Sequence, residues 1–154
     1  MPDYFHLVPQ IRGTGKYIDI SLDEIERQLG HNNKFKFEGE LLLEDDGEEV
    51  VVPINLHIGS TNGCTAWTVA ITLHSKRIDC IDHERTYISN AGEKESGWHR
   101  HAWDVASQSC DIPKVPLQDF TDDLPLREFL VRSFQMMGVL LNAEDHGNYE
   151  LQFN

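Results

Sequence analysis

The sequence predicts an α+β fold, in which an antiparallel sheet of about five or six strands is packed by a C-terminal amphipathic helix. Three observations support this. Short strand-like segments follow one another at hairpin spacing between residues 34 and 103. Apolar residues recur at three- and four-residue steps over 126–137. The 154 residues, of which 40% are hydrophobic and 25% charged, fit a single globular domain over 1–154.

A short helix precedes the sheet. Ser21-Leu-Asp-Glu24 matches a capping box, in which Ser21 is the N-cap and Glu24 bonds back to it. Ile25 then shares an apolar face with the residue four positions later. The pattern predicts a helix over 22–29 that ends at Gly30.

The first two strands form a hairpin. Residues 34–43 alternate between apolar and charged side chains, which is typical of a half-buried strand. Asp46-Gly47 favours a two-residue turn in which both residues have positive φ. The partner strand is 49–56, and Pro53 within it predicts an edge position or a bulge, since proline cannot donate to a ladder.

The remaining elements follow from turn residues and apolar runs. In chain order, we predict a turn at 59–63, strands at 66–73 and 77–81, a loop at 88–97, a strand at 98–103, a long loop at 107–124, a helix at 126–137 and a last strand at 149–153. The helix is expected to begin with an acidic N-cap and Pro125 in its first turn, and to stop at Gly138.

The charge and the cysteine content exclude several classes of function. Thirteen basic residues against twenty-six acidic ones give a net charge of −13, which argues against a broad nucleic-acid footprint and suits a cationic partner. The three cysteines form no CxxC pair, so zinc-ribbon and thioredoxin-type sites are not predicted. Neither a secretion signal nor an apolar stretch of about 18 residues is present, so we expect a cytoplasmic protein without membrane contact.

The strand over 98–103 carries the main candidate site. Its alternation predicts that His99, His101 and Trp103 project from one face, and that Arg100 projects from the other. Two imidazoles roughly 7 Å apart can bracket a phosphate as base and acid, or they can share a metal ion. We assign them to acid–base chemistry without a cofactor or metal, and keep metal coordination as the alternative.

Five further residues complete the predicted site. Tyr87 is expected to donate a hydrogen bond, and Trp103 to stack on a base. Because Arg100 faces away from the imidazoles, the phosphate-neutralising cation is predicted to be Arg85 or Arg77 on a neighbouring strand, with Arg100 as a more distant substrate contact. A base, an acid and a cation suffice for RNA cleavage without a metal ion.

The order of these motifs resembles a known family. Glu84-Arg85-Thr-Tyr87, a polar glycine loop, Gly97-Trp-His99-Arg-His101 and a terminal amphipathic helix are similar to the TumE-type toxins of bacterial toxin–antitoxin modules. The resemblance covers about residues 34–141. It implies a ribonuclease-like toxin, acting on RNA and neutralised by a cognate antitoxin.

The acidity of the chain supports a different class of function. The predicted hairpin tip gathers five acidic residues: Glu44, Asp45, Asp46, Glu48 and Glu49. The turn places like charges opposite each other, which is destabilising unless the tip is screened by solvent or recognises something cationic. The alternative function is therefore a non-enzymatic inhibitory protein, such as a nucleic-acid mimic or a phage counter-defence protein, that occupies a basic surface of a partner. A scaffold subunit without a site of its own is a third interpretation.

Overall fold

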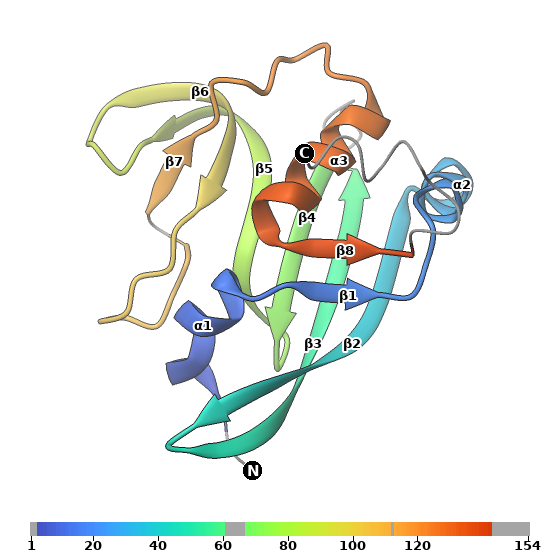
Figure 1. Cartoon of the computed structure of the whole chain (residues 1–154). Helices are drawn as coiled ribbons and strands as arrows, with labels where there is room; N and C mark the ends of the chain where they lie inside the picture. The colour runs from blue at the N-terminus through green and yellow to red at the C-terminus, as the bar shows by residue number, and fades with distance from the viewer. Residues whose placement is uncertain (1–2, 61–66, 112, 143–154) are drawn as a thin grey trace.

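A six-stranded antiparallel sheet dominates the computed structural model, which describes residues 3–60, 67–111 and 113–142. Its strands pair in chain order as a meander (Figure 1). They are β2 (Lys34–Asp45), β3 (Glu48–Ser60), β4 (Trp67–Leu73), β5 (Lys76–Ile88), β6 (Lys94–His101) and β7 (Lys114–Pro116). The predicted α+β class and antiparallel meander are confirmed.

Shorter elements cover one face of this sheet. They are η1 (Phe5–Leu7), α1 (Val8–Gly13), β1 (Lys16–Ile18), α3 (Leu126–Met137) and β8 (Val139–Leu141). β1 and β8 form a parallel pair that crosses in front of the sheet, with α3 above it (Figure 1). We call these elements the front layer. The remaining helix, α2 (Leu22–Asn32), lies beside the β2 edge.

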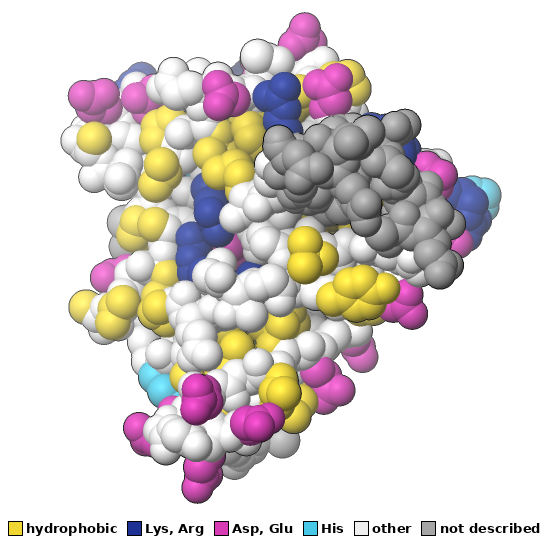
Figure 2. All heavy atoms as spheres, in the orientation of Figure 1, with side chains coloured by type: hydrophobic (Ala, Val, Ile, Leu, Met, Phe, Trp, Pro, Cys, Tyr) yellow, Lys and Arg dark blue, Asp and Glu magenta, His cyan; other side chains and the backbone are white. Residues whose placement is uncertain are grey.

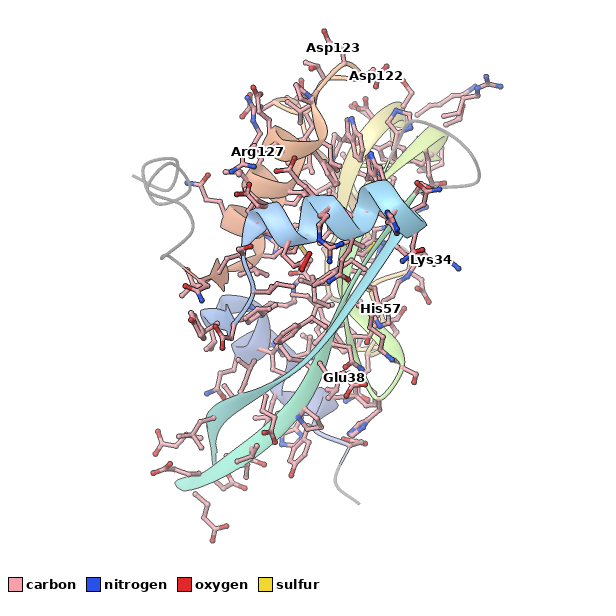
Figure 3. All side chains as sticks on the ribbon, turned by 90° about the vertical axis from the view of Figure 1, so that its right-hand side faces the viewer. Lys34, Glu38, His57, Asp122, Asp123 and Arg127 are labelled. Atoms are coloured by element: carbon pink, nitrogen blue, oxygen red, sulfur yellow. The ribbon has the colours of Figure 1, made fainter. Side chains whose placement is uncertain are left out.

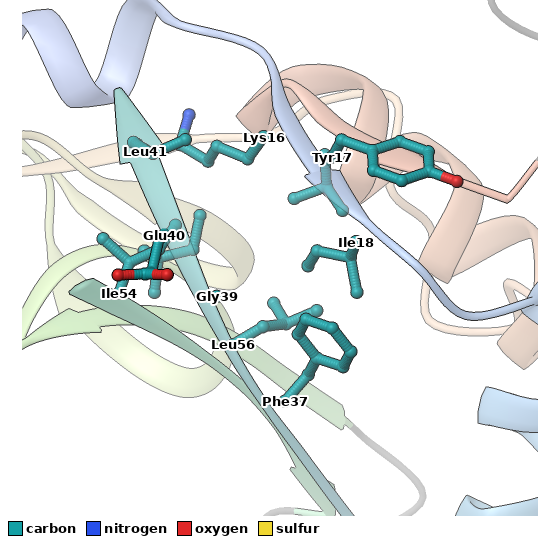
Figure 4. A pocket seen from close by; sticks show the side chains of 11 residues that line it. Lys16, Tyr17, Ile18, Phe37, Gly39, Glu40, Leu41, Ile54 and Leu56 are labelled. Carbon is teal, nitrogen blue, oxygen red and sulfur yellow. The ribbon is translucent and has the colours of Figure 1, made fainter. Parts of the chain in front are cut away.

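The hydrophobic core fills the space between the front layer and the sheet. Phe129 and Phe134 of α3 are almost fully buried, and the Trp98 ring lies 4.6 Å from the Phe129 ring. Between β1 and β2 only about 10 Å³ stays empty, beside Ile18 and Leu56 (Figure 4). Such a void holds at most about one water molecule, so the space between β1 and β2 is packed core.

Local signals placed several elements correctly. Asp46 and Gly47 have φ values of 52° and 80°, and the predicted opposition of Glu44 with Glu49 is present. Helix α3 spans the predicted residues, and Gly138 ends it at φ 72°. Pro53 pairs with β2, whereas the pairing of β3 with β4 begins at Asn55. Among the described strands, β3 therefore has a neighbour on only one side at Pro53, which corresponds to the predicted edge position.

The helix boundaries need two corrections. Helix α2 runs through Gly30 to Asn32, because the left-handed residue that ends it is Asn33 at φ 57°. Ser21 is the N-cap, accepting from the Glu24 amide at 3.0 Å, but the Glu24 carboxylate bonds Arg27. Helix α3 has Pro125 as N-cap without a side-chain hydrogen bond, in place of the expected acidic cap.

The strand boundaries differ more. β5 extends well past the predicted 77–81, β6 begins within the predicted loop 88–97, and β7 lies within the predicted loop 107–124. In β5 and β6 the backbone pairing continues through polar residues that show no apolar alternation, and β7 is only three residues long. Of the predicted turn at 59–63, residues 59 and 60 belong to β3; the rest, and the predicted strand 149–153, lie outside the described residues. No described helix has the length and apolarity to cross a membrane.

Candidate metal centre

One row of paired residues crosses all six strands on the face turned away from α3. In order from β2 to β7 it is Lys36, His57, Ala70, Cys80, His101 and Lys114. Directly opposed residues share a face of a sheet, so this row defines one surface, which we call the polar face. Asp82 pairs with His99 one step along the same face. Asp82 and Glu84 of β5 therefore meet His99 and His101 of β6.

These four side chains converge. The His99 Nε2 atom lies 2.5 Å from Asp82 Oδ1 and 3.2 Å from Glu84 Oε1. The His101 Nε2 atom lies 3.3 Å from the same Asp82 oxygen. One nitrogen or oxygen from each residue lies within 4.8 Å of all the others. We call Asp82, Glu84, His99 and His101 the metal cluster.

The Nδ1 atoms of the two histidines determine the orientation and the tautomer of the neutral rings. His101 Nδ1 lies 2.6 Å from the Cys110 carbonyl oxygen, and His99 Nδ1 lies 3.3 Å from that of Gly97. A carbonyl oxygen only accepts, so each Nδ1 carries the hydrogen and each neutral ring has an unprotonated Nε2. The Nε2 of His99 is buried and makes no hydrogen bond within the described part of the chain, despite its nearness to Asp82. Metal-binding histidines show this pattern.

Burial gives the cluster a closed and an open side. The His99 side chain is fully buried and that of His101 is 6% exposed, whereas Asp82 and Glu84 are 15% and 37% exposed. The Tyr87 ring packs on His99 with centroids 4.2 Å apart. Lys114 Nζ donates to Glu84 Oε1 at 2.6 Å. Solvent therefore reaches the cluster from the carboxylate side.

The ionised carboxylate is the favoured form of Asp82. Burial is the largest single influence on Asp82 and raises its pKa, but the adjacent rings of His101 and His99, which act in this way when their Nε2 atoms are protonated, together hold the pKa well below the ordinary value. Burial, then the nearby carboxylates of Glu95 and Glu84, raises the pKa of Tyr87. The Tyr87 hydroxyl is also buried without a hydrogen-bond partner in the described residues.

The predicted site residues have separate locations. His99 and His101 lie on one face with their ring centroids 5.1 Å apart, and Tyr87 touches His99. Arg85 is exposed near an irregularity of β5, with no ion pair to another described residue. Arg77, at the start of β5, lines a separate hollow of the polar face. Their catalytic or substrate-binding roles stay predictions.

Two predicted site residues belong to the core side. Trp103 lies beyond the end of β6, so it does not share the histidine face; it packs against the core, since the strand pairing stops at His101. Arg100 faces away from the histidines, as predicted. Its guanidinium group makes a bidentate interaction with Asp79, in which Nε donates to Oδ1 at 3.0 Å and Nη2 donates to Oδ2 at 2.7 Å. Arg12 of α1 lies 3.1 Å from the same carboxylate. We call Arg12, Asp79 and Arg100 the arginine cluster.

The acidic residues of the alternative hypothesis lie at the tip of the β2–β3 hairpin. Figure 2 shows acidic side chains gathered at this projecting lower end. Asp45 contacts His6 of η1 at 3.0 Å. The tip is therefore far along the sheet from the metal cluster, and the two candidate surfaces are distinct.

Sequence reasoning missed both carboxylates of the metal cluster. The signal that could have found them is Asp82-His83-Glu84, whose alternation matches that of His99-Arg100-His101 on the next strand. Comparison with known proteins gives no further guidance, because no protein-family model, curated protein or solved structure matches the chain.

Proposed function

We propose that the protein binds a divalent transition-metal ion through His99, His101, Asp82 and Glu84. The observation that carries the proposal is the orientation of the two imidazoles. Their Nδ1 hydrogens are used by backbone carbonyls, so two unprotonated nitrogens face carboxylate oxygens. Lone pairs that face anions repel each other unless a proton or a metal cation lies between them, and one metal cation can serve both imidazoles and both carboxylates at once.

Charge and donor type agree with such an ion. Two neutral imidazoles and two carboxylates carry a charge of −2, which a divalent cation neutralises in a largely buried site. Mixed nitrogen and oxygen ligands suit Zn²⁺, Mn²⁺, Fe²⁺ or Ni²⁺ better than Mg²⁺ or Ca²⁺. The Nε2–carboxylate distances of 3.2 and 3.3 Å are close to the ~3.4 Å that separates two ligands of a tetrahedral zinc ion. The 2.5 Å contact requires Asp82 to turn slightly outward.

The four residues of the metal cluster would have different roles in holding the ion. His99, His101 and Asp82 form the enclosed side, whereas Glu84 lies at the open side and is shared with Lys114. Three protein ligands and one exchangeable position are typical of catalytic zinc, whereas four protein ligands are typical of structural zinc. Because Lys114 competes for the Glu84 carboxylate, the position beside Glu84 is the one open to water or substrate.

Metal titration tests the proposal. Isothermal titration of chelator-treated protein with Zn²⁺ should show one ion per chain, and His101→Gln or Asp82→Asn should weaken it by roughly 100-fold or more. His83→Gln is the matched control, since His83 lies between Asp82 and Glu84 but points to the opposite face, against Trp98. Circular dichroism checks that each variant is folded. Equal affinity in wild type and His101→Gln, or no binding of any of the four ions, would overturn the proposal.

Cleavage of RNA, which the TumE-type resemblance implies, is a second candidate. In its favour, both histidines lie in one cluster with Tyr87 against His99. The burial of both rings does not favour their direct use as acid and base on a phosphodiester. A ribonuclease assay with and without chelator distinguishes a metal-dependent mechanism from a metal-free one. Activity that persists in chelator and is lost in His99→Ala supports the metal-free mechanism.

A further inference from the structure

A second feature of the polar face is an open hollow of about 890 Å³ over β2 to β5. It is distinct from the metal cluster and lies along the same row of paired residues. The polar side chains that matter most among those lining it are Lys34, Lys36, Asn55, His57, Thr72 and Arg77. Figure 3 shows Lys34 and His57 on the side of the sheet turned away from α3. We call this the cationic hollow.

Its charge is opposite to that of the chain. Acidic residues outnumber basic ones two to one in the sequence, yet Lys34, Lys36 and Arg77 line the hollow, and none of its described lining residues is Asp or Glu. Glu38, an acidic residue on the same face, lies 3.7 Å from Lys36 and is 77% exposed. Burial, then the neighbouring charges of Lys36 and Arg77, lowers the pKa of His57. The described lining of the hollow therefore carries a net positive formal charge.

A buried hydroxyl within the hollow also lacks a partner. Thr72 is 8% exposed, and its Oγ1 atom makes no hydrogen bond within the described part of the chain. A buried hydroxyl without a partner is costly, and such groups often serve a ligand. Asn55 pairs directly with Thr72, and so does Arg77 from the other side, which places amide, hydroxyl and guanidinium donors in one line across three strands.

We propose that the cationic hollow binds a phosphate-bearing anion. Lysine, arginine and hydroxyl donors on one surface are the groups that recognise phosphate oxygens. A small anion fits better than a nucleic-acid polymer, because the net charge of −13 repels a long polyanion. The proposal does not depend on the metal cluster, since neither Asp82 nor any other member of that cluster lines the hollow.

Titration of the full chain with inorganic pyrophosphate tests the proposal. Chelator is present throughout, so that pyrophosphate cannot bind through a metal ion. We expect a Kd below about 1 mM that rises with salt concentration. Arg77→Glu and Lys36→Glu should each weaken binding roughly tenfold. Lys94→Glu, an exposed lysine at the start of β6, is the matched control with the same change of net charge, and it should stay within about twofold.

Thr72→Val keeps the shape of the side chain and removes only the hydroxyl. It should weaken pyrophosphate binding about threefold without lowering the stability of the fold, because the hydroxyl has no partner to lose. A short RNA oligonucleotide is titrated in parallel. RNA binding that shares the Arg77→Glu sensitivity would identify backbone phosphates as the source of the anion. Absence of binding by both probes, or equal losses in Arg77→Glu and Lys94→Glu, would overturn the proposal.

Discussion

Two buried polar clusters lie on opposite faces of the same two strands, and they differ in how their hydrogen-bonding groups are used. In the arginine cluster, Asp79 is 1% exposed and receives hydrogen bonds from Arg100 on both of its oxygens, with Arg12 beside it. In the metal cluster, the imidazole hydrogens are used by backbone carbonyls. The first cluster is complete within the described chain, whereas the second is, on the proposed function, completed by a bound cation.

The difference separates a structural role from a binding role. A buried carboxylate with two guanidinium partners is already satisfied within the fold, so the arginine cluster joins α1 to the sheet. A buried nitrogen without a hydrogen-bond partner is unfavourable until something binds it. Variants in each cluster should therefore respond differently to metal.

The largest effect is expected in the arginine cluster. Asp79→Asn leaves two guanidinium groups without their counter-charge, and arginine cannot lose its proton. The free energy of unfolding should fall by about 3 to 5 kcal/mol, measured by urea denaturation with chelator present. Asp82→Asn is the matched control and should cost less, because the imidazoles beside Asp82 can exist as uncharged rings, whereas a guanidinium group keeps its charge. A larger loss in Asp82→Asn than in Asp79→Asn would contradict the comparison.

Lys16 is a buried basic residue that belongs to neither the arginine cluster nor the metal cluster. It is 1% exposed, donates to the carbonyls of Thr14 and Met137, and burial lowers its pKa from 10.5 to about 8. Between these pH values the unfolded chain holds a proton that the folded chain has released, so stability rises with pH. The unfolding free energy of the wild type should gain about 3 kcal/mol over that of Lys16→Met between pH 8 and 10.5. Parallel pH profiles would contradict this.

Metal should stabilise the fold through one cluster only. At a Zn²⁺ concentration 100 times the Kd, the free energy of unfolding should rise by about 2.7 kcal/mol. The rise should vanish in His101→Gln and persist in Arg12→Met, a change on the other face. Thermal unfolding with and without Zn²⁺ measures it, and an equal rise in both variants would show that zinc binds elsewhere.

The smallest effect is expected at the exposed hairpin tip. Glu44 and Glu49 face each other across β2 and β3 and are both exposed, so Glu49→Lys replaces a repulsion by an attraction. The gain should be roughly 0.5 kcal/mol at low salt and should fade at high salt. Urea denaturation at two ionic strengths measures it. The same variant would lose binding to a basic partner if the acidic tip has the inhibitory function.

What the sequence could predict was set by local interactions. The Asp46-Gly47 turn determined the register of its hairpin, and the spacing of apolar residues determined helix α3. Strand alternation also placed His99 and His101 on one face. In contrast, β5 was predicted to end at Ile81, because residues 82–86 are polar and show no apolar alternation, so Asp82 and Glu84 were not connected with the histidines.

Such local patterns do not predict contacts between segments that are distant in the sequence. Nothing local in Arg12 or Asp79 indicates that α1 packs on β5, and a three-residue strand such as β1 has too few residues for a periodic signal. Both depend on how separate elements pack together, which propensity does not encode.

The parallel pairing of β1 with β8 joins Ile18 to Leu141, near the two ends of the described chain. During synthesis, the meander has all its strands as soon as β7 has left the ribosome, but β1 has no neighbour for its backbone until β8 has followed. Lys16 obtains the Met137 carbonyl at the same moment. The front layer therefore cannot close before β8 has been made, and closing it removes water from an ammonium group that was synthesised more than a hundred residues earlier.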